Sequence, residues 1–349
     1  MGDNQNIDKL CWGDRSGNKE VARASNFELL RLVCMLLIIC GHIIMIHGYD
    51  TVGDSSWYIK QIFTPFCTVA VNIFVLISGY FGIKLNTKKL WSLNCMVTLY
   101  CVVFLALALV LGIHTLSISK DWMQLVPVVT KQYWFITVYF ALCLISPFLN
   151  KLVEVLDKEM YKKLLLTSIV LFCILPTFAV ILNFKTITLD SGYGLVNFVF
   201  LYLMGRYIRL HNRFELSKYK YLGLYIVCMS IMAAFQICYS KLLGFDFDAL
   251  ISYDTFFTFV GAVGLFMYFR ELSFSNTMIN QLAKPCLAVY VIHLNPLIFH
   301  YIFDDILHTK AYSGYSYVTF LLVAPPVIYL VCAVIELCRN KAVLLLIKQ

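Results

Sequence analysis

The stretch FELLRLVCMLLIICGHIIMIHG, residues 27–48, decides the fold class of this protein. An α-helix needs about 20 mostly apolar residues to cross the hydrocarbon core of a bilayer, and this stretch is long enough. It also contains Glu28, Arg31, His42 and His47. Polar side chains inside a membrane are costly and commonly functional, so the stretch predicts both a membrane span and a site.

The composition of the whole chain agrees with this interpretation. Of its 349 residues, 60% are hydrophobic and only 14% are charged, whereas soluble domains contain about 25% charged residues. Ten apolar runs are separated by polar breaks: 27–48, 62–83, 91–113, 133–149, 164–182, 195–210, 219–240, 251–269, 285–303 and 317–338. We therefore expect an all-α integral membrane protein, a bundle of about ten transmembrane helices.

This pattern also predicts the domain organisation. Residues 1–26 are polar and lack the apolar core of a signal peptide, so we expect a cytosolic tail there and an insertion signal in the first span. A single membrane-embedded domain should follow over 27–340, with a short cytosolic tail over 341–349. The second run is interrupted by Pro65, Gly79 and Gly82, which predicts a broken or re-entrant segment beside a cavity.

The basic residues predict the orientation, because Lys and Arg accumulate in the cytoplasmic loops of membrane proteins. The segments 1–26, 84–90, 150–163, 206–220, 270–284 and 339–349 hold 21 of the 28 Lys and Arg residues, and the alternate loops hold six. This split predicts an even number of spans with both termini cytoplasmic. It also gives the net charge of +8 a topological origin, so we expect no nucleic-acid partner.

The 13 cysteines form no Cys-x-x-Cys pair, and most lie inside apolar runs. There they act as small buried apolar side chains. We assign no metal and no permanently bound cofactor to them.

Arg31 and His42 lie on one stripe of the first predicted helix. They are eleven residues apart, which is about 20° past three full turns and about 16.5 Å along the axis. Arg31 should lie near the cytoplasmic boundary, where Glu28, one turn earlier, can pair with it. His42 should lie near or beyond the middle of the bilayer.

Each of these residues has a structural and a functional interpretation. Arg31 and Glu28 can reach the lipid headgroups, and His42 can form a hydrogen bond between helices. Alternatively, a neutral imidazole facing a cavity accepts a proton from a hydroxyl, and a guanidinium at the cytoplasmic mouth binds a phosphorylated ligand. The alignment of Arg31 with His42 favours the functional interpretation.

The arginine and histidine spacing in RLVCMLLIICGH (31–42) resembles the acyltransferase 3 family of membrane O-acyltransferases. Other pieces are similar to the family's segments in the expected order: VNIFVLISGYFGIK (71–84), YWFITVYFALCLISPFL (133–149), FLYLMGRYIRL (200–210) and CLAVYVIHLNPL (286–297). The resemblance covers residues 26–340. It implies transfer of an acetyl group from cytosolic acetyl-CoA to a hydroxyl of a cell-surface polysaccharide or its lipid-linked precursor, at the plasma or inner membrane.

The resemblance also implies residue roles. His42 would activate the acceptor hydroxyl, either directly or after carrying the acyl group itself, and Arg31 would help to hold the coenzyme A end. Many members have an Arg-x-x-Arg pair after the second span, where this chain has Lys84, Lys88 and Lys89. Lysine binds phosphate as a point charge without the bidentate fork, so these lysines are either coenzyme A ligands or ordinary cytoplasmic charge.

Several further residues are candidates for lining the site. Ser78 and Gly79 could offer a free backbone amide to a carbonyl oxygen or pack two helices together. Asn72 could bind substrate or a neighbouring helix. Trp134 suits an interfacial anchor better than a sugar platform.

The remaining candidates lie nearer the chain's C-terminal half. His293 precedes Asn295 and Pro296, which should open the local backbone beside it. It could line the site or form a packing hydrogen bond. Arg206 and Arg209 could bind coenzyme A phosphates, although fixing the topology explains them as well. The acids Asp246, Asp248, Asp304 and Asp305 could contact a glycan or be solvated loop charges.

A multi-pass transporter is the competing function, with Arg31, His42 and His293 as a substrate path. No paired carboxylate lies deep in any predicted span to share a proton relay, because Glu28 and Asp254 lie at span ends. This pattern favours the acyltransferase.

Overall fold

The computed structural model describes residues 24–49, 51–182, 184, 190–211 and 216–347, and in these ranges it is mainly helical with no β-strand. The long helices are α1 (Ser25–His47), α2 (Ser55–Phe81), α3 (Thr87–Val110), α5 (Trp134–Val155), α6 (Lys158–Ile169), α9 (Lys218–Leu243) and α13 (Gly314–Ile347). α6 continues through the π-helical turn η2 (Val170–Ile174) into α7 (Leu175–Leu182). The shorter elements are α4 (Ile118–Asp121), η1 (Trp122–Leu125), α8 (Leu195–His211), α10 (Phe256–Arg270), α11 (Thr277–Leu282), α12 (Cys286–His293), η3 (Tyr301–Ile306) and η4 (Thr309–Ala311).

Seven helices in this part of the chain are long and apolar enough to cross a membrane, with α6 and α7 counted as one. The sequence predicts about ten spans, and seven helices of the described residues have the length and apolar composition of a span. α8 has 17 residues, α10 has 15 and α12 has eight, so each is shorter than the roughly 20 residues of a full crossing. For the described residues, the all-α architecture is confirmed, together with several helices that are long and apolar enough to span a membrane.

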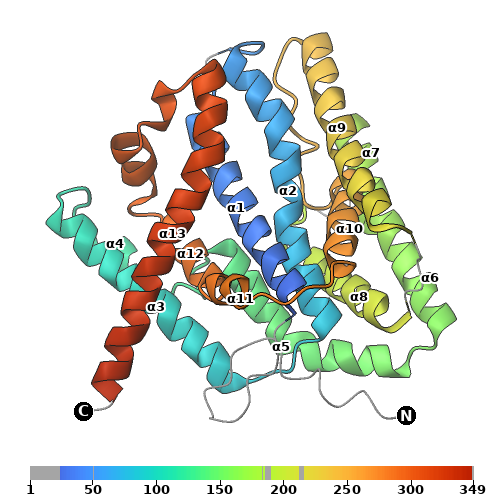
Figure 1. Cartoon of the computed structure of the whole chain (residues 1–349), viewed down its shortest axis with the longest axis horizontal. Helices are drawn as coiled ribbons and strands as arrows, with labels where there is room; N and C mark the ends of the chain where they lie inside the picture. The colour runs from blue at the N-terminus through green and yellow to red at the C-terminus, as the bar shows by residue number, and fades with distance from the viewer. Residues whose placement is uncertain (1–23, 50, 183, 185–189, 212–215, 348–349) are drawn as a thin grey trace.

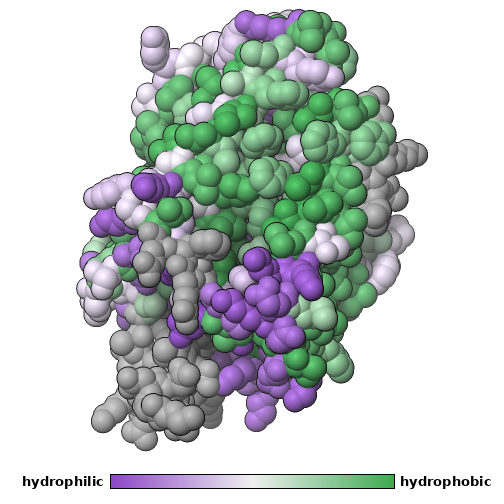
Figure 2. Space-filling model, turned by 90° about the vertical axis from the view of Figure 1, so that its right-hand side faces the viewer, coloured by the Kyte–Doolittle hydropathy of each residue, from purple (hydrophilic) through white to green (hydrophobic). Residues whose placement is uncertain are grey.

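The helices form one bundle around α1 and α2 (Figure 1). α3 and α13 lie on one side of this central pair, and α6, α7 and α9 lie on the other. The start of α1 and the end of α13 lie on the same side of the bundle. Figure 2 shows a broad apolar surface on the face that carries α6 and α9, as expected for side chains in contact with lipid.

The prediction of a broken second segment is wrong, because α2 is one continuous helix of 27 residues that includes Pro65. Proline removes one helical hydrogen bond and crowds the preceding turn. Two thirds of the apolar part of α2 is buried, including Pro65 itself, so packing against neighbouring helices supports the helix at this position. Gly82 only ends the helix, with a positive φ of 74° that suits glycine.

Gly79 serves helix packing. A Cβ atom at this position would collide with the backbone carbonyl of Tyr202 in α8, and one at Gly205 would collide with that of Leu76 in α2. The two glycines thus let the backbones of α2 and α8 approach closely, a common device between membrane helices. Gly79 therefore belongs to the interface between these helices.

The ninth apolar run, residues 285–303, is interrupted by a turn at the place that the sequence predicted. α12 ends at His293, and a turn containing Asn295 and Pro296 leads to η3. α13 continues to Ile347, so no helix end marks the predicted domain boundary at residue 340. Of the predicted N-terminal tail, residues 1–23 lie outside the described part of the chain.

Candidate active site

A large cavity runs through the bundle beside α1. Its volume is about 1280 Å³, and its walls come from α1, α2, the start of α5, α12 and several connecting segments. Its lining on α1 extends from Glu28 in the first turn to Gly48 just after the last. Arg31 and His42 both line it, so the stripe predicted from their spacing is the side of α1 that faces the cavity.

One end of the cavity is basic. Arg31 donates a hydrogen bond from Nη1 to Glu28 Oε1 at 2.8 Å, which lowers the cost of placing the guanidinium there. Lys84, Lys89 and Lys284 line the same end. Lys284 is absent from the sequence-based candidates, because its loop carries the charge expected of any cytoplasmic connection.

A pair of histidines lies at the cavity wall, where His42 lines the cavity and His293 supports it from behind. His42 Nδ1 lies 3.0 Å from His293 Nε2, and His293 Nδ1 lies 2.7 Å from the backbone carbonyl oxygen of Val289. His293 is only 1% exposed, whereas His42 is partly exposed and lines the cavity. The two residues are 251 positions apart in sequence, so only the folded bundle brings them together.

When both rings are neutral, these contacts determine which nitrogen of each carries the proton. A carbonyl oxygen only accepts, so His293 must carry its proton on Nδ1 and present a lone pair on Nε2. His42 must then donate from Nδ1, which leaves a lone pair on its own Nε2. This nitrogen of a cavity-lining ring is suited to accept a proton or to attack a carbonyl carbon.

Three aromatic side chains form part of the cavity wall. Trp134 lies 4.5 Å from Tyr193 and 5.5 Å from Tyr253 between ring centroids, and all three residues line the cavity. Asn72 donates a hydrogen bond to the backbone carbonyl oxygen of Tyr253 at 2.8 Å. Trp134 therefore lies among the site-lining candidates, while Asn72 positions the segment that carries Tyr253.

Ser78 also lines the cavity, but its predicted backbone role is wrong. Its hydroxyl donates to the Phe74 carbonyl oxygen at 2.9 Å and lies 3.3 Å from the Tyr139 hydroxyl. Both Ser78 and Gly79 lie within the last turns of a continuous helix, where amides bond to the carbonyls of the preceding turn. Their amides are therefore not available to a substrate carbonyl.

The remaining basic candidates lie outside the cavity lining. Lys88 is exposed. The Arg206 guanidinium packs against Gly82, because a Cβ atom added to Gly82 would lie 2.7 Å from Arg206 Nη1. Arg209 donates to the Tyr80 hydroxyl at 3.2 Å and covers its ring. The two arginines therefore connect α8 to the end of α2 rather than lining the site.

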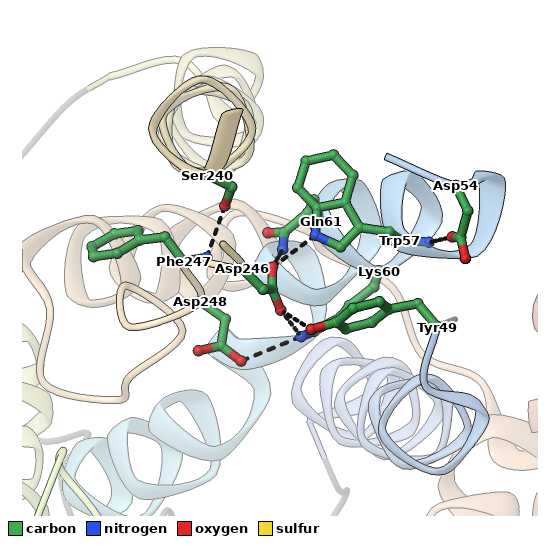
Figure 3. A network of polar contacts seen from close by, with 9 residues as sticks. All are labelled: Tyr49, Asp54, Trp57, Lys60, Gln61, Ser240, Asp246, Phe247 and Asp248. Atoms are coloured by element: carbon green, nitrogen blue, oxygen red, sulfur yellow. Dashed lines mark hydrogen bonds and ion pairs between the residues drawn. The ribbon is translucent and has the colours of Figure 1, made fainter. Parts of the chain in front are cut away.

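At the opposite end, Asp246 is the centre of a polar network (Figure 3). Its carboxylate accepts hydrogen bonds from Tyr49 Oη at 2.9 Å, Trp57 Nε1 at 2.7 Å, Lys60 Nζ at 2.6 Å and Gln61 Nε2 at 2.5 Å. The network ties the segment before α10 to α2 and to the α1–α2 connection. Because that segment also supplies cavity-lining residues from Asp248 to Tyr253, the network positions this part of the wall.

We expect Asp246→Asn to destabilise the protein by about 1–3 kcal/mol, because it removes hydrogen bonds to a charged acceptor. Burial alone would raise the pKa of Asp246, but hydrogen bonds from Lys60, Trp57 and Tyr49 outweigh it and lower the pKa. The stabilisation is therefore present above the ordinary carboxyl pKa and is lost as pH falls through the lowered pKa. Thermal unfolding in detergent, with the exposed Asp305→Asn as control, measures the difference. Equal unfolding temperatures would contradict it.

Comparison with known proteins identifies the family of the chain. No curated protein and no solved structure matches the chain. A family model described as an acyltransferase domain matches residues 25–337, which include the whole cavity-lining set. The chain therefore belongs to the acyltransferase 3 family.

Proposed function

We propose that this protein is a membrane O-acyltransferase that moves an acetyl group from cytosolic acetyl-CoA to a hydroxyl of a cell-surface polysaccharide or lipid-linked glycan precursor. It would act in the plasma or inner membrane, with both termini in the cytoplasm. The observation that carries the proposal is the hydrogen-bonded His42–His293 pair on a cavity whose end holds Arg31. Family membership supports acyl transfer as the reaction class.

The basic end supports a phosphorylated donor. Arg31, Lys84, Lys89 and Lys284 line it, and cations bind phosphate groups as point charges or bidentate donors. His42 lies about 16.5 Å further along α1, at 1.5 Å per residue. A donor with charged phosphates at one end of a long arm and a thioester at the other, such as acetyl-CoA, matches this separation.

The proposed reaction uses His42 Nε2 as a general base. It takes the proton from the acceptor hydroxyl, whose oxygen forms a bond to the thioester carbonyl carbon, and the carbonyl oxygen becomes an oxyanion. The carbon–sulfur bond then breaks, and the departing thiolate takes the proton from His42. A base positioned in this way contributes about 10²–10⁴-fold to the rate.

The test uses membranes that contain the wild-type protein, with acetyl-CoA as donor. We expect release of free thiol together with ester-linked acetate on the glycan of the same membranes. Replacing Lys84, Lys89 and Lys284 together by glutamine should raise the KM for acetyl-CoA about tenfold or more, because each charged contact contributes on the order of 1 kcal/mol. The matched control replaces Lys88, Lys162 and Lys163, exposed lysines outside the cavity lining.

Two results would overturn this proposal. One is the absence of thiol release from wild-type membranes that contain folded protein. The other is uptake of a labelled solute without consumption of the thioester, which would indicate a transporter.

A further inference from the structure

The hydroxyl of Tyr290 stands out among the polar groups around the cavity. Tyr290 is 5% exposed and lines the cavity, and its hydroxyl proton has no acceptor within the described ranges. A buried donor without an acceptor costs about 1–3 kcal/mol of stability. In a native protein such a group calls for an explanation, and a bound substrate would supply the missing partner.

Tyr290 lies beside the histidine pair. It precedes His293 by one turn of α12, and the centroids of the two rings are 6.2 Å apart. Residues three apart in a helix lie on the same face. His42 and Tyr290 both line the cavity, and His293 contacts the first and lies one turn from the second.

The start of α5 makes this part of the cavity electropositive. The Tyr290 ring lies 5.8 Å from that of Phe135, the second residue of α5. The first amides of a helix have no partner within it and carry partial positive charge, and Tyr133 at the N-cap provides no side-chain cap. The Phe135 amide approaches the Tyr290 oxygen but can only donate, so the hydroxyl proton still lacks an acceptor.

Two other buried tyrosines show what distinguishes Tyr290. The Tyr133 hydroxyl donates to the Val291 carbonyl oxygen and accepts from Asn295, both at 2.9 Å, so its hydrogen bonds are structural. The Tyr317 hydroxyl also has no partner among the described residues, but Tyr317 is not in the cavity lining. Among these three, Tyr290 alone combines a hydroxyl proton without an acceptor with a place in the cavity wall.

We propose that Tyr290 is a catalytic residue whose hydroxyl donates a hydrogen bond to the carbonyl oxygen of the acyl thioester. This inference rests on the proposed function. When the acceptor oxygen attacks the carbonyl carbon, the carbonyl π electrons move to its oxygen, and the Tyr290 proton and the start of α5 stabilise that charge. The tyrosine keeps its proton throughout, and the oxyanion reforms the double bond as the carbon–sulfur bond breaks.

The test is Tyr290→Phe, which removes only the hydroxyl and keeps the ring contacts. Loss of one oxyanion donor commonly lowers kcat by about 10²–10³-fold, and we expect this fall with the KM for acetyl-CoA changed less than threefold. Because the lost hydroxyl donates to no acceptor among the described residues and gives up only the approach of the Phe135 amide, the unfolding temperature should change little. The matched control is Tyr317→Phe, which should keep wild-type kcat.

The outcomes separate this inference from the proposed function. Wild-type membranes without acetyl-CoA-dependent thiol release would overturn both. If the wild-type protein is active and the kcat of Tyr290→Phe lies within threefold of the wild-type kcat, the role of Tyr290 is overturned and the proposed function is not. A Tyr290→Phe protein that unfolds at a markedly lower temperature, or changes only the KM for acetyl-CoA, would also overturn it, since a structural or binding role would explain either result.

Discussion

Replacing His42 by alanine should lower acetyl transfer by about 10²–10⁴-fold, the usual contribution of a positioned base. The reason is that Nε2 of His42 is the imidazole nitrogen that the hydrogen bonds with His293 and Val289 leave with a lone pair at the cavity. Thiol release from acetyl-CoA and ester-linked acetate on membrane glycan measure the effect. The KM for acetyl-CoA should change little, because the basic groups lie at the other end of the cavity.

The control for this variant is His300→Ala. His300 has an exposed side chain near η3 and does not line the cavity, so its loss should leave activity unchanged. Added imidazole should restore part of the activity of His42→Ala, because the vacated space opens to the cavity. A fully active His42→Ala protein would disprove the role of His42 as base or nucleophile.

The second large effect is expected at His293, which acts through His42. Replacing His293 by leucine removes the acceptor for His42 Nδ1, so the His42 ring loses both its fixed proton position and its orientation. We expect kcat to fall by about 10²–10⁴-fold, similar to the loss of the base itself, since a wrongly placed proton removes its function. kcat and KM for acetyl-CoA measure the effect.

A conservative variant distinguishes positioning from structure. His293→Gln keeps a carbonyl oxygen that can accept from His42 Nδ1, so it should recover a clear part of the activity that His293→Leu loses. Unfolding temperatures of both variants show whether the bundle remains folded. Equal activity of the leucine and glutamine variants, with both folded, would indicate that the hydrogen bond to His42 has no positioning role.

The local sequence was sufficient to predict where several helices of the bundle lie in the chain. Apolar runs such as 27–48 correspond to α1 because a membrane helix satisfies all its backbone hydrogen bonds within one segment. The shared face of Arg31 and His42 follows from the fixed rotation per residue of that helix. The turn after His293 follows from Asn295 and Pro296.

Other features depend on packing that local sequence does not encode. Pro65 suggested a break, yet α2 is continuous and mostly buried against its neighbouring helices. Gly79 was a candidate for binding substrate, and its position against Tyr202 shows a packing role. Arg206 and Arg209 resembled phosphate ligands, but the bundle places them outside the cavity lining.

The amino-acid sequence by itself determined a membrane-embedded helical protein with Arg31 and His42 on one face of its first span, because hydrophobicity and helical period are local properties. Only the tertiary structure decided that His293 holds His42, that Lys284 joins the basic end, and that the Tyr290 hydroxyl lies in the cavity wall. The histidine pair alone joins segments that are 251 positions apart. Their side chains meet through the packing of whole helices, and that packing minimises the free energy of the entire bundle rather than of any one segment.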